Sequence, residues 1–336
     1  MSSDSKPLKM VTCPGCDAKT FIPGDLPPLA TEICKKCGHA IMMPMQLRQF
    51  ELRSKIASGG MGTVYRAWDR TLERMVAVKL MRKEMLADPK MAESFAAEAR
   101  TCARLNHQHI IHIYTFDEWE GERYLVMELA DQGSLDARIE KLHALPELQV
   151  LDVGIKIAQA LDTVLKHNLL HCDIKPGNIL FNAEHEPKLV DFGLARKVDA
   201  EQVETEFAHG TPYYVAPEKI KREPETYLSD MYSLGATLYH AITGYVPFDA
   251  PTVQELVLAQ VQTPLRPAIE VVPEISQPTS DALSKALAKM PADRFLSYDD
   301  FILALEASRS LLLRQQSQAP ESPLQPKRIT SWWRKQ

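Results

Sequence analysis

Several common features are missing from this sequence, and each absence excludes a class of protein. No apolar run approaches about 18 residues, so no transmembrane helix is expected. The opening stretch MSSDSKPLKM has no apolar h-region, so we expect neither a secretory signal nor a location outside the cytoplasm. Neither sign of charge dominates: 39 Lys and Arg stand against 44 Asp and Glu, which excludes a general polyanion binder. No internal repeat is present.

Cysteine is scarce, and its distribution is uneven. Of six cysteines in 336 residues, four form two C-x-x-C pairs near the N-terminus, whereas Cys102 and Cys172 are isolated. A secreted disulfide framework would spread its pairs through the chain, so this pattern indicates a metal site and two free thiols. The paired residues are Cys13, Cys16, Cys34 and Cys37.

The two C-x-x-C pairs, CPGC and CKKC, are separated by seventeen residues. Four thiolates at this spacing can converge tetrahedrally on one Zn²⁺, which makes free or redox thiols the weaker interpretation. Residues 1–45 resemble a zinc ribbon, too short for a sizeable core, so structural zinc would supply most of the folding free energy. Such a ribbon can bind nucleic acid, bind protein or brace its neighbour. Mixed charge and the lack of interleaved aromatic residues disfavour nucleic acid.

The rest of the chain changes from strand-rich to helix-rich. The runs TVYRAWD, RMVAVKLM and YLVMEL, rich in valine, tyrosine and leucine, predict strands. They are interrupted by a predicted helix over residues 88–105, with Asp88 as the N-cap and Pro89 at the first helical position. After Gly133, apolar residues recur at helical spacing, which predicts helices over residues 145–167, 227–244, 251–261 and 278–290.

The two ends of the chain have a different composition. Residues 1–11 are polar, and we expect them to form a loose start. Residues 313–336 are rich in proline, glutamine and serine and predict a disordered tail. Near its end, Trp332 and Trp333 lie between basic residues, a weak indication of contact with a membrane surface or a partner groove, and incidental aromatic residues are an equal alternative.

The stretch IASGGMGTVYRA, residues 56–67, is rich in glycine. Gly59, Gly60 and Gly62 allow backbone N–H groups to approach phosphate oxygens without hindrance from a Cβ atom. The loop lies between strands and not ahead of a helix, which argues against a Rossmann or Walker site. Val64 can cover a purine ring. Fifteen residues later, VAVK places Lys79 on a strand as a candidate for the α- and β-phosphates of a nucleotide.

A second stretch, HCDIKPGNIL at residues 171–180, gathers a carboxylate, an ammonium group and a carboxamide. These are Asp173, Lys175 and Asn178, at a spacing typical of a phosphoryl-transfer loop. The tripeptide DFG follows at residues 191–193. Phosphoryl transfer brings charged groups together and depends on cations that offset phosphate repulsion, so these residue types suit that chemistry.

With these stretches in order, residues 50–312 resemble a Hanks-type (eukaryotic-like, bacterial) serine/threonine protein kinase. The resemblance implies an α+β, bilobal protein-kinase fold, with a strand-rich N-lobe at 50–130 and a helical C-lobe at 131–312, preceded by the small zinc ribbon. It implies ATP-dependent phosphorylation of serine and threonine residues on protein substrates, with Mg²⁺ (or Mn²⁺), with autophosphorylation, and in signalling. The implied location is cytoplasmic.

The resemblance also implies roles for individual residues. Asp173 would orient the substrate hydroxyl, Lys175 would stabilise the transferring phosphoryl group, and Lys79 would pair with Glu98. Ala57 departs from the family pattern because it occupies the first glycine position of the loop. The implied nucleotide-binding residues are Ile56, Ala57, Ser58, Gly59, Gly60, Met61, Gly62, Val64, Ala77, Lys79, Met127, Glu128, Ala130, Asn178, Leu180 and Asp191.

Two further sets of residues are implied. Asn178 and Asp191 would hold the Mg²⁺ ions, and LVMELA would be the hinge, with Met127 as gatekeeper and backbone groups from Glu128 to Ala130 facing adenine.

The segment GTPYYVAPE, residues 210–218, matches the substrate-binding loop and A-P-E motif of protein kinases and not of small-molecule kinases. Thr211 would bond the catalytic groups through its hydroxyl, as in serine/threonine kinases. Glu218 would pair with Arg294 of PADRF, and Asp230 would brace the backbone of the catalytic loop.

Cys172 stands where many family members carry an arginine that clamps a phosphothreonine. A thiol cannot make that contact, so the chain is of the non-RD type, and our hypothesis is that its loop becomes ordered without a phosphate clamp. Thr205→Ala would then retain activity. The acids of residues 199–206 either substitute for phosphate or are simply solvated, and solvation is the simpler interpretation.

Two alternatives to an active kinase follow from the sequence: a pseudokinase scaffold, or a binding module that acts through the zinc ribbon. The first is disfavoured because Lys79, Asp173, Asn178 and Asp191 are all present. The second would be supported by salt-dependent nucleic-acid binding of residues 1–45.

Overall fold

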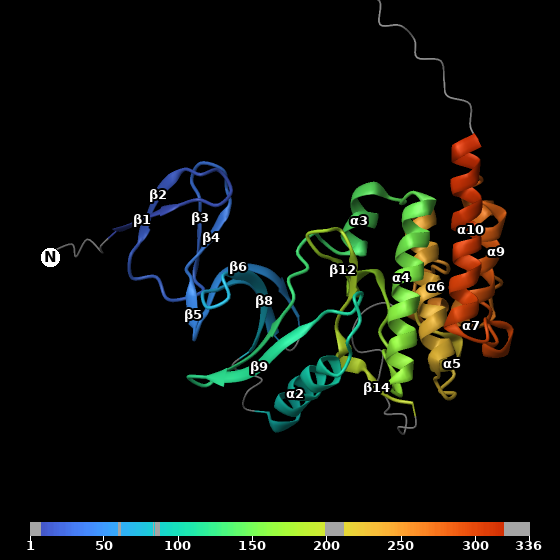
Figure 1. The fold of residues 1–336 in the computed structure, drawn as a ribbon, viewed down its shortest axis with the longest axis horizontal. Coiled ribbons are helices and arrows are strands. Elements are labelled where there is room, and N and C mark those ends of the chain that lie inside the picture. Colours follow the sequence, from blue (N-terminus) through green and yellow to red (C-terminus); the bar gives the residue numbers. More distant parts are fainter. Residues whose placement is uncertain (1–7, 60–61, 83, 85–87, 199–211, 319–336) are drawn as a thin grey trace, which may run out of the picture.

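The computed structural model describes residues 8–59, 62–82, 84, 88–198 and 212–318. Three regions follow one another along the long axis of the molecule (Figure 1): a small module of short strands, a curved sheet with one helix, and a group of helices. This arrangement is the α+β, bilobal one predicted from the sequence.

Two hairpins build the cysteine module. β1 (Leu8–Thr12) pairs antiparallel with β2 (Lys19–Pro23), and β3 (Thr31–Ile33) pairs with β4 (Ala40–Met42). Each hairpin carries one C-x-x-C pair in its turn. Because β1 begins at Leu8, the last four residues of the expected loose start are in fact extended and paired.

A six-stranded antiparallel sheet forms the middle region, in the order β5-β6-β7-β8-β10-β9. Its strands coincide with the apolar, β-branched runs of the sequence because such side chains pack well on a pleated, half-buried surface. The strands are β5 (Met45–Leu47), β6 (Phe50–Ser58), β7 (Gly62–Asp69), β8 (Arg74–Met81), β9 (Ile113–Trp119) and β10 (Glu122–Met127).

The cysteine module is continuous with this sheet. β5 follows β4 directly and pairs with β6, so the expected boundary between residues 45 and 50 lies inside a single sheet. Three apolar side chains from residues 29–45 also pack against the core of the sheet, which includes Leu47, Phe50 and Leu52. The three are Leu29, Met42 and Met45.

The single described helix of the middle region, α2 (Pro89–Ala103), begins at the proline that the sequence placed in its first turn. Its apolar face packs on the sheet, where Phe95 and Ala99 contact Met81 and Leu125. This packing fixes the helix beside β8, which carries Lys79.

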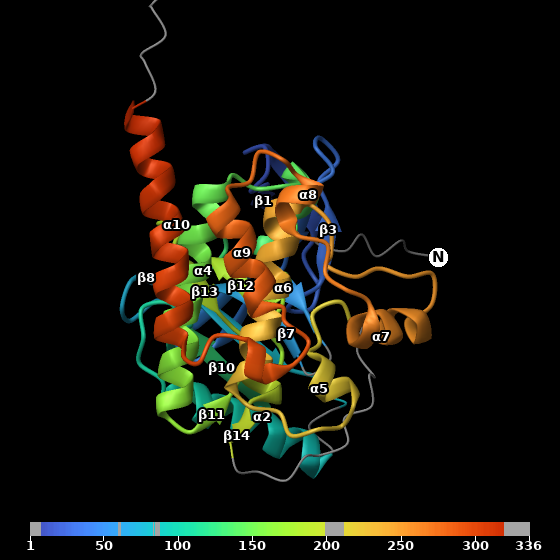
Figure 2. The same cartoon turned by 90° about the vertical axis from the view of Figure 1, so that its right-hand side faces the viewer.

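The helical region is organised around α6 (Tyr227–Thr243), of whose 17 residues 13 are buried. α4 (Glu147–Lys166) crosses it closely: a Cβ atom at Gly154 would lie 2.7 Å from a Leu238 methyl carbon. α10 (Tyr298–Gln318) packs on α4 and α9 (Figure 2). The remaining helices are α3 (Leu135–Leu142), α5 (Pro217–Ile220), α7 (Val253–Gln262), α8 (Ala268–Val271) and α9 (Gln277–Ala286).

Short strands and 3₁₀ turns join the two large regions. β11 (Leu169–Leu170) pairs with β14 (Arg196–Lys197), and β12 (Ile179–Phe181) pairs with β13 (Pro187–Leu189). The 3₁₀ turns are η1 (Pro176–Asn178), η2 (Phe192–Leu194) and η3 (Pro291–Asp293). These segments hold the stretch 171–193 that the sequence singled out.

α10 ends at Gln318, six residues beyond the boundary expected at 312. Leu312 still packs against the core, whereas residues 313–317 are exposed, so the helix continues past its last core contact. The remainder of the expected disordered tail, including both tryptophans, lies outside the described residues. Over the part of the chain that the structure describes, no helix has the length and apolar character needed to cross a bilayer.

Candidate active site

Lys79 of β8 and Glu98 of α2 form an ion pair that joins the sheet to its helix. Lys79 Nζ lies 2.7 and 2.8 Å from the two carboxylate oxygens of Glu98, and both side chains are largely buried. Burial raises the pKa of the Glu98 carboxyl group, the nearby Asp191 carboxylate adds to this, and the Lys79 ammonium opposes it. The Lys79 ammonium group is therefore held in a poorly solvated position and is oriented by two hydrogen bonds to Glu98.

The glycine-rich stretch is the turn of the β6–β7 hairpin. Gly59 N–H donates to the carbonyl of Gly62 at 2.9 Å, and the hydroxyls of Ser58 and Thr63 are 2.9 Å apart. Gly62 tolerates no side chain, because a Cβ atom there would lie 2.5 Å from the carbonyl oxygen of Leu80. Gly60 and Met61, also expected at the nucleotide, lie outside the described residues.

The register of the sheet brings other expected nucleotide contacts together. Val64 is the direct cross-strand partner of Lys79, and Ala77 is the partner of Met127. The N–H of Glu128 already donates to the carbonyl of His112 at 2.8 Å, so this donor is not the group that faces adenine. Of the other expected nucleotide contacts, Ile56 and Ala57 lie on β6, Ala130 follows β10, and Leu180 lies on β12.

Asp173 is surrounded by the two other groups of its loop. Lys175 Nζ lies 3.0 and 2.7 Å from the Asp173 carboxylate oxygens, and Asn178 Nδ2 donates to the carboxylate at 2.9 Å and to the Asp173 carbonyl at 2.8 Å. Because the Asn178 amide donates both of its N–H groups to Asp173, its Oδ1 is the atom that can bind a metal. Pro176 opens the 3₁₀ turn that brings Asn178 back to Asp173.

His171 connects this loop to the segment before Asp191. It is fully buried, and burial lowers the pKa of its imidazole, so the ring is neutral. Its Nδ1 accepts from Asp173 N–H at 3.3 Å, which leaves Nε2 to donate to the carbonyl of Val190 at 3.1 Å. The ring also stacks edge-on against buried Phe192, with ring centroids 4.7 Å apart.

Asp191 has a left-handed backbone conformation, with φ +65° and ψ +72°, and it caps η2 by accepting from Gly193 N–H. This conformation is uncommon for residues other than glycine and is held by the surroundings. Val190 N–H donates to the Asn178 carbonyl at 3.0 Å. Asp191 and Asn178 are therefore fixed relative to one another, and their oxygen atoms are donors that Mg²⁺ accepts.

Two buried carboxylates hold the framework below the site, as the sequence predicted. Asp230 accepts from the N–H groups of His171 at 2.7 Å and Cys172 at 2.8 Å. Burial raises the pKa of Asp230, and its two hydrogen bonds oppose that shift. Glu218 forms a two-pronged ion pair with Arg294, at 2.7 Å for each prong. Both predicted contacts are confirmed.

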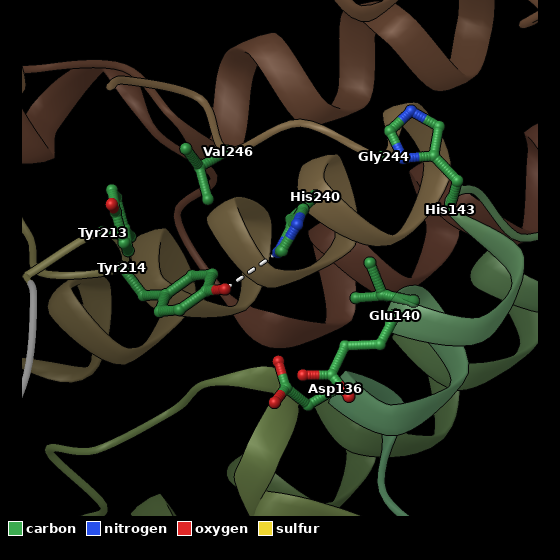
Figure 3. Close-up of a pocket in the computed structure, with 9 residues that line it drawn as sticks. Asp136, Glu140, His143, Tyr213, Tyr214, His240, Gly244 and Val246 are labelled. Atoms are coloured by element: carbon green, nitrogen blue, oxygen red, sulfur yellow. Dashed lines mark hydrogen bonds between the residues drawn. The ribbon is translucent and has the colours of Figure 1, made fainter. Parts of the chain in front are cut away.

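A cavity of about 520 Å³ lies beside Tyr213 and Tyr214, in the segment predicted to bind substrate (Figure 3). The Tyr214 hydroxyl is 2.8 Å from His240 Nδ1, and burial raises the pKa of the tyrosine and lowers that of the histidine. The helix α3 supplies two carboxylates to this cavity, Asp136 and Glu140. No sequence pattern predicted this cavity, because its walls come from three separate chain segments, residues 136–143, 213–214 and 240–246.

The four paired cysteines converge in the turns of the two hairpins. Their sulfur atoms all lie within 4.8 Å of one another, with Cys13 Sγ 3.6 Å from Cys37 Sγ and Cys16 Sγ 3.9 Å from Cys34 Sγ. Sulfur atoms bound to one tetrahedral zinc ion at about 2.3 Å are about 3.8 Å apart, whereas a disulfide is about 2.05 Å. Backbone N–H groups of Cys37 and Lys36 lower the pKa of Cys34 to about 6, whereas the pKa of Cys37 rises to about 12 because the neighbouring thiols outweigh the backbone N–H of His39, so thiolate is favoured at Cys34 and disfavoured at Cys37. The residues thus fit a zinc ion.

The structure brings six of the predicted residues into two groups: Lys79, Glu98 and Asp191, and Asp173, Lys175 and Asn178. Thr211 and Thr205 lie outside the described residues, so the structure does not place them. Sequence reasoning missed the groups around Cys172, namely Arg196, Lys219 and Glu225, because single charged residues in loops carry no periodic or motif signal.

The sheet, the helical region and these charged groups define the class of bilobal protein kinases. The family described as protein kinase domain matches residues 50–301. The serine/threonine-protein kinase PknA of Mycobacterium tuberculosis is 36% identical over 268 residues, which cover 78% of this chain and 62% of PknA. Serine/threonine-protein kinase PknH of the same organism is 32% identical over 290 residues, or 82% of this chain and 46% of PknH.

The chain therefore belongs to the protein kinase domain family, with relatives among bacterial, Hanks-type serine/threonine kinases. It spans less than two thirds of the length of these curated relatives, so activity and partners are not transferred from them as wholes.

Proposed function

We propose that the chain is an ATP- and Mg²⁺-dependent protein serine/threonine kinase. The observation that carries this proposal is the arrangement of Asp173 with Lys175 and Asn178, close to an intact Lys79–Glu98 pair. A pseudokinase scaffold has no need for such a complete set of charged groups. Family membership and the names of the relatives support the same reaction class.

Each residue has a defined part in the proposed reaction. Asp173 would accept the proton of a seryl or threonyl hydroxyl. The hydroxyl oxygen would form a bond to the γ-phosphorus of ATP while the bond from that phosphorus to the ADP oxygen breaks. Lys175 is already within hydrogen-bond distance of Asp173, so its ammonium would stabilise charge where that oxygen attacks. Lys79 would hold the α- and β-phosphates.

Asn178 and Asp191 would hold the metal, through Asn178 Oδ1 and the Asp191 carboxylate. When bound, Mg²⁺ supplies positive charge that offsets the charge of the phosphates. Among the backbone groups of the hinge, we propose that the Glu128 carbonyl and Ala130 N–H face adenine, because Glu128 N–H is bonded to His112.

A polypeptide acceptor is supported by the cavity beside Tyr213 and Tyr214. Tyr213 and Tyr214 line one side of this cavity, and the α3 carboxylates of Asp136 and Glu140 line another (Figure 3). We propose that the acceptor chain passes along it. Autophosphorylation, a signalling role and the cytoplasmic location stay predictions, as does the hypothesis that the loop needs no phosphate.

The proposed activity is tested by transfer of labelled phosphate from ATP to protein or peptide acceptors, with Asp191→Asn as the matched control. We expect seryl and threonyl labelling by the wild type and none by the variant. Equal labelling by both, or binding of ATP without any transfer to an acceptor or to the protein itself, would favour a scaffold.

For the cysteine module, we propose a structural zinc ribbon that braces the sheet of the kinase domain. The sulfur–sulfur distances support one zinc ion per chain. Of the three roles that a ribbon can have, bracing is supported by the pairing of β5 with β6 and by the packing of Leu29, Met42 and Met45 on the sheet. Binding of nucleic acid has no such support.

A further inference from the structure

The carboxylate of Glu225 joins two cations, Arg196 and Lys219, which come before and after residues 199–218 in the sequence. Glu225 Oε1 lies 3.1 Å from Arg196 Nη2, and Glu225 Oε2 lies 3.3 Å from Lys219 Nζ. The exposed fractions of the three side chains are 12% for Glu225, 18% for Arg196 and 23% for Lys219. In a site this poorly solvated, an ion pair is screened much less than at the surface, and an unpaired charge is unfavourable.

Both cations also reach the residue before Asp173. Lys219 Nζ donates to the carbonyl of Cys172 at 3.3 Å. Arg196 is the cross-strand partner of Leu170, where β11 leads into the catalytic loop, and its side chain contacts the Cys172 thiol. Burial, with Asp230 and Glu225 nearby, raises the pKa of Cys172 to about 12, so the thiol is neutral and adds no charge to this group.

Cys172 has a backbone conformation that needs support. Its φ of +65° is uncommon for a residue other than glycine. Asp230 holds its N–H, and Lys219 holds its carbonyl. Both backbone groups of Cys172 are thus fixed by side chains, and Glu225 is the anion that keeps Lys219 in place.

Glu225 itself is held by the start of α6. The next residue, Thr226, caps that helix in a reciprocal capping box with Ser229. The hydroxyl of Ser229 donates to Glu218 at 2.7 Å, and Glu218 is in turn paired with Arg294. The carboxylate of Glu225 is therefore presented from a rigid point, five residues before Asp230, which binds the same loop.

We propose that Glu225 is a positioning residue for phosphoryl transfer: it holds Arg196 and Lys219 so that Cys172 and the adjoining Asp173 keep their geometry. This inference rests on the proposed kinase activity and deepens it. The missing arginine at position 172 raised the question of which anion orders this region. In this proposal that anion is the Glu225 carboxylate, which lies outside residues 199–211, and no phosphate group is needed to hold Arg196 and Lys219.

The inference is tested with the full-length protein and a peptide acceptor. We expect Glu225→Gln to lower kcat by about tenfold to a hundredfold, because the ion pairs that hold Arg196 and Lys219 beside Cys172 are lost, while KM for MgATP changes by less than about twofold. Glu225→Asp should recover part of the rate. Glu118→Gln is the control, since it removes an equivalent but exposed pair with Arg123. Rates are referred to the fraction of protein that binds ATP.

A double-variant cycle with Arg196→Gln separates positioning from simple damage. If Glu225 acts through Arg196, the two substitutions together lower kcat by less than the product of their separate effects. Effects that multiply would overturn that part of the inference. Wild-type protein treated with phosphatase should keep its kcat, and a fall to the level of Glu225→Gln would overturn it as well.

Failure of the inference is distinguishable from failure of the proposed function. An active wild type, an inactive Asp191→Asn variant and a Glu225→Gln variant with unchanged kcat would overturn the inference alone. If the wild type transfers no phosphate, hydrogen exchange decides: peptides covering residues 169–175 should exchange faster in Glu225→Gln than in wild type or Glu118→Gln. Equal exchange would then overturn the positioning role.

Discussion

Arg294 and Glu218, 76 residues apart in the sequence, form a fully buried ion pair in which each guanidinium Nη atom meets one carboxylate oxygen at 2.7 Å. The side chains are 0% and 2% exposed. Arg294 also donates to the carbonyls of Ala288 and Leu228, so its charge is surrounded by acceptors. The pair joins Glu218, in α5, to Arg294, at the end of η3.

Removal of one partner of this pair should be strongly destabilising. Arg294→Met leaves the Glu218 carboxylate buried without its cation, and we expect a loss of about 3–5 kcal/mol in the free energy of unfolding. Arg294→Met combined with Glu218→Gln should lose less, because no unpaired charge remains. Urea denaturation measures both, and a loss below about 1 kcal/mol for the single variant would contradict a buried, charged pair.

The Lys79–Glu98 pair should matter for the reaction more than for the fold. Glu98→Gln keeps the shape of the side chain but removes the charge that orients Lys79, so we expect phosphoryl transfer to fall at least tenfold, equivalent to about 1.4 kcal/mol. Thermal denaturation should change little, since the pKa of Glu98 is already raised by burial. Steady-state kinetics with Arg100→Gln, which alters the exposed pair with Glu93, provides the comparison. Similar rates in both variants would exclude an orienting role.

Zinc should be present at one equivalent per chain, and its removal should weaken the whole sheet. Elemental analysis measures the ion, and thermal denaturation with and without a strong chelator measures its contribution. We expect the chelated protein to melt at a lower temperature. Metal binding contributes most of the folding free energy of such a small module, and the module is part of the kinase sheet because β5 pairs with β6.

Cysteine variants identify the zinc ligands. Cys34→Ser should lose the ion, whereas Cys102→Ser, which alters a buried thiol bonded to the Ile111 carbonyl, should retain it. Zinc at full occupancy in Cys34→Ser, or a melting temperature indifferent to chelator, would count against the ribbon.

Because of Lys289, the free energy of unfolding should change with pH in the alkaline range. Its ammonium group donates to the Gln260 carbonyl at 2.6 Å, and burial, with Arg294 nearby, lowers its pKa from 10.5 to about 8. Because the folded pKa is below the unfolded one, the unfolded chain binds more protons between these values. The contribution of this group to stability therefore rises as pH increases from about 8 to 10.5 and is lost as pH falls through about 8.

Lys289→Met removes this titration. The free energy of unfolding, measured across the same pH window, should rise less with pH, or fall more, in the variant than in the wild type. Parallel curves for the two proteins would show that Lys289 titrates normally in the folded state.

The cavity beside Tyr214 should favour basic acceptors. Its carboxylates, Asp136 and Glu140, face a His240 that burial keeps neutral, so negative charge prevails there. We expect Asp136→Asn with Glu140→Gln to raise KM about two- to tenfold for acceptor peptides with lysine or arginine near the hydroxyl, as partly exposed ion pairs contribute little each. Peptides without basic residues serve as the control. An equal change for both peptide sets would remove the cavity from the acceptor path.

Much of the fold was predictable because it depends on local pattern. Strands at β7, β8 and β10 and the helices α2, α4 and α6 follow from side-chain periodicity and from caps such as Pro89. The Glu218–Arg294 pair and the bracing of the catalytic-loop backbone by Asp230 were predicted through the family resemblance, whereas the particular N–H groups that Asp230 accepts from, those of His171 and Cys172, come from the structure. The roles of Lys79, Asp173 and Asn178 in catalysis stay predictions. Errors fell at the boundaries, where β1 and α10 extend further than composition indicated.

The sequence by itself determined which chemical groups are present and how they are spaced: two cysteine pairs, a glycine hairpin, and the carboxylates, ammonium groups and carboxamide of a kinase. Tertiary structure alone decided that β5 joins the cysteine module to the kinase sheet, that three chain segments line the cavity at Tyr214, and that Glu225 meets Arg196 and Lys219. The physical reason is that these contacts link residues far apart in the chain. Their formation depends on how helices and strands pack, which no local pattern of residues encodes.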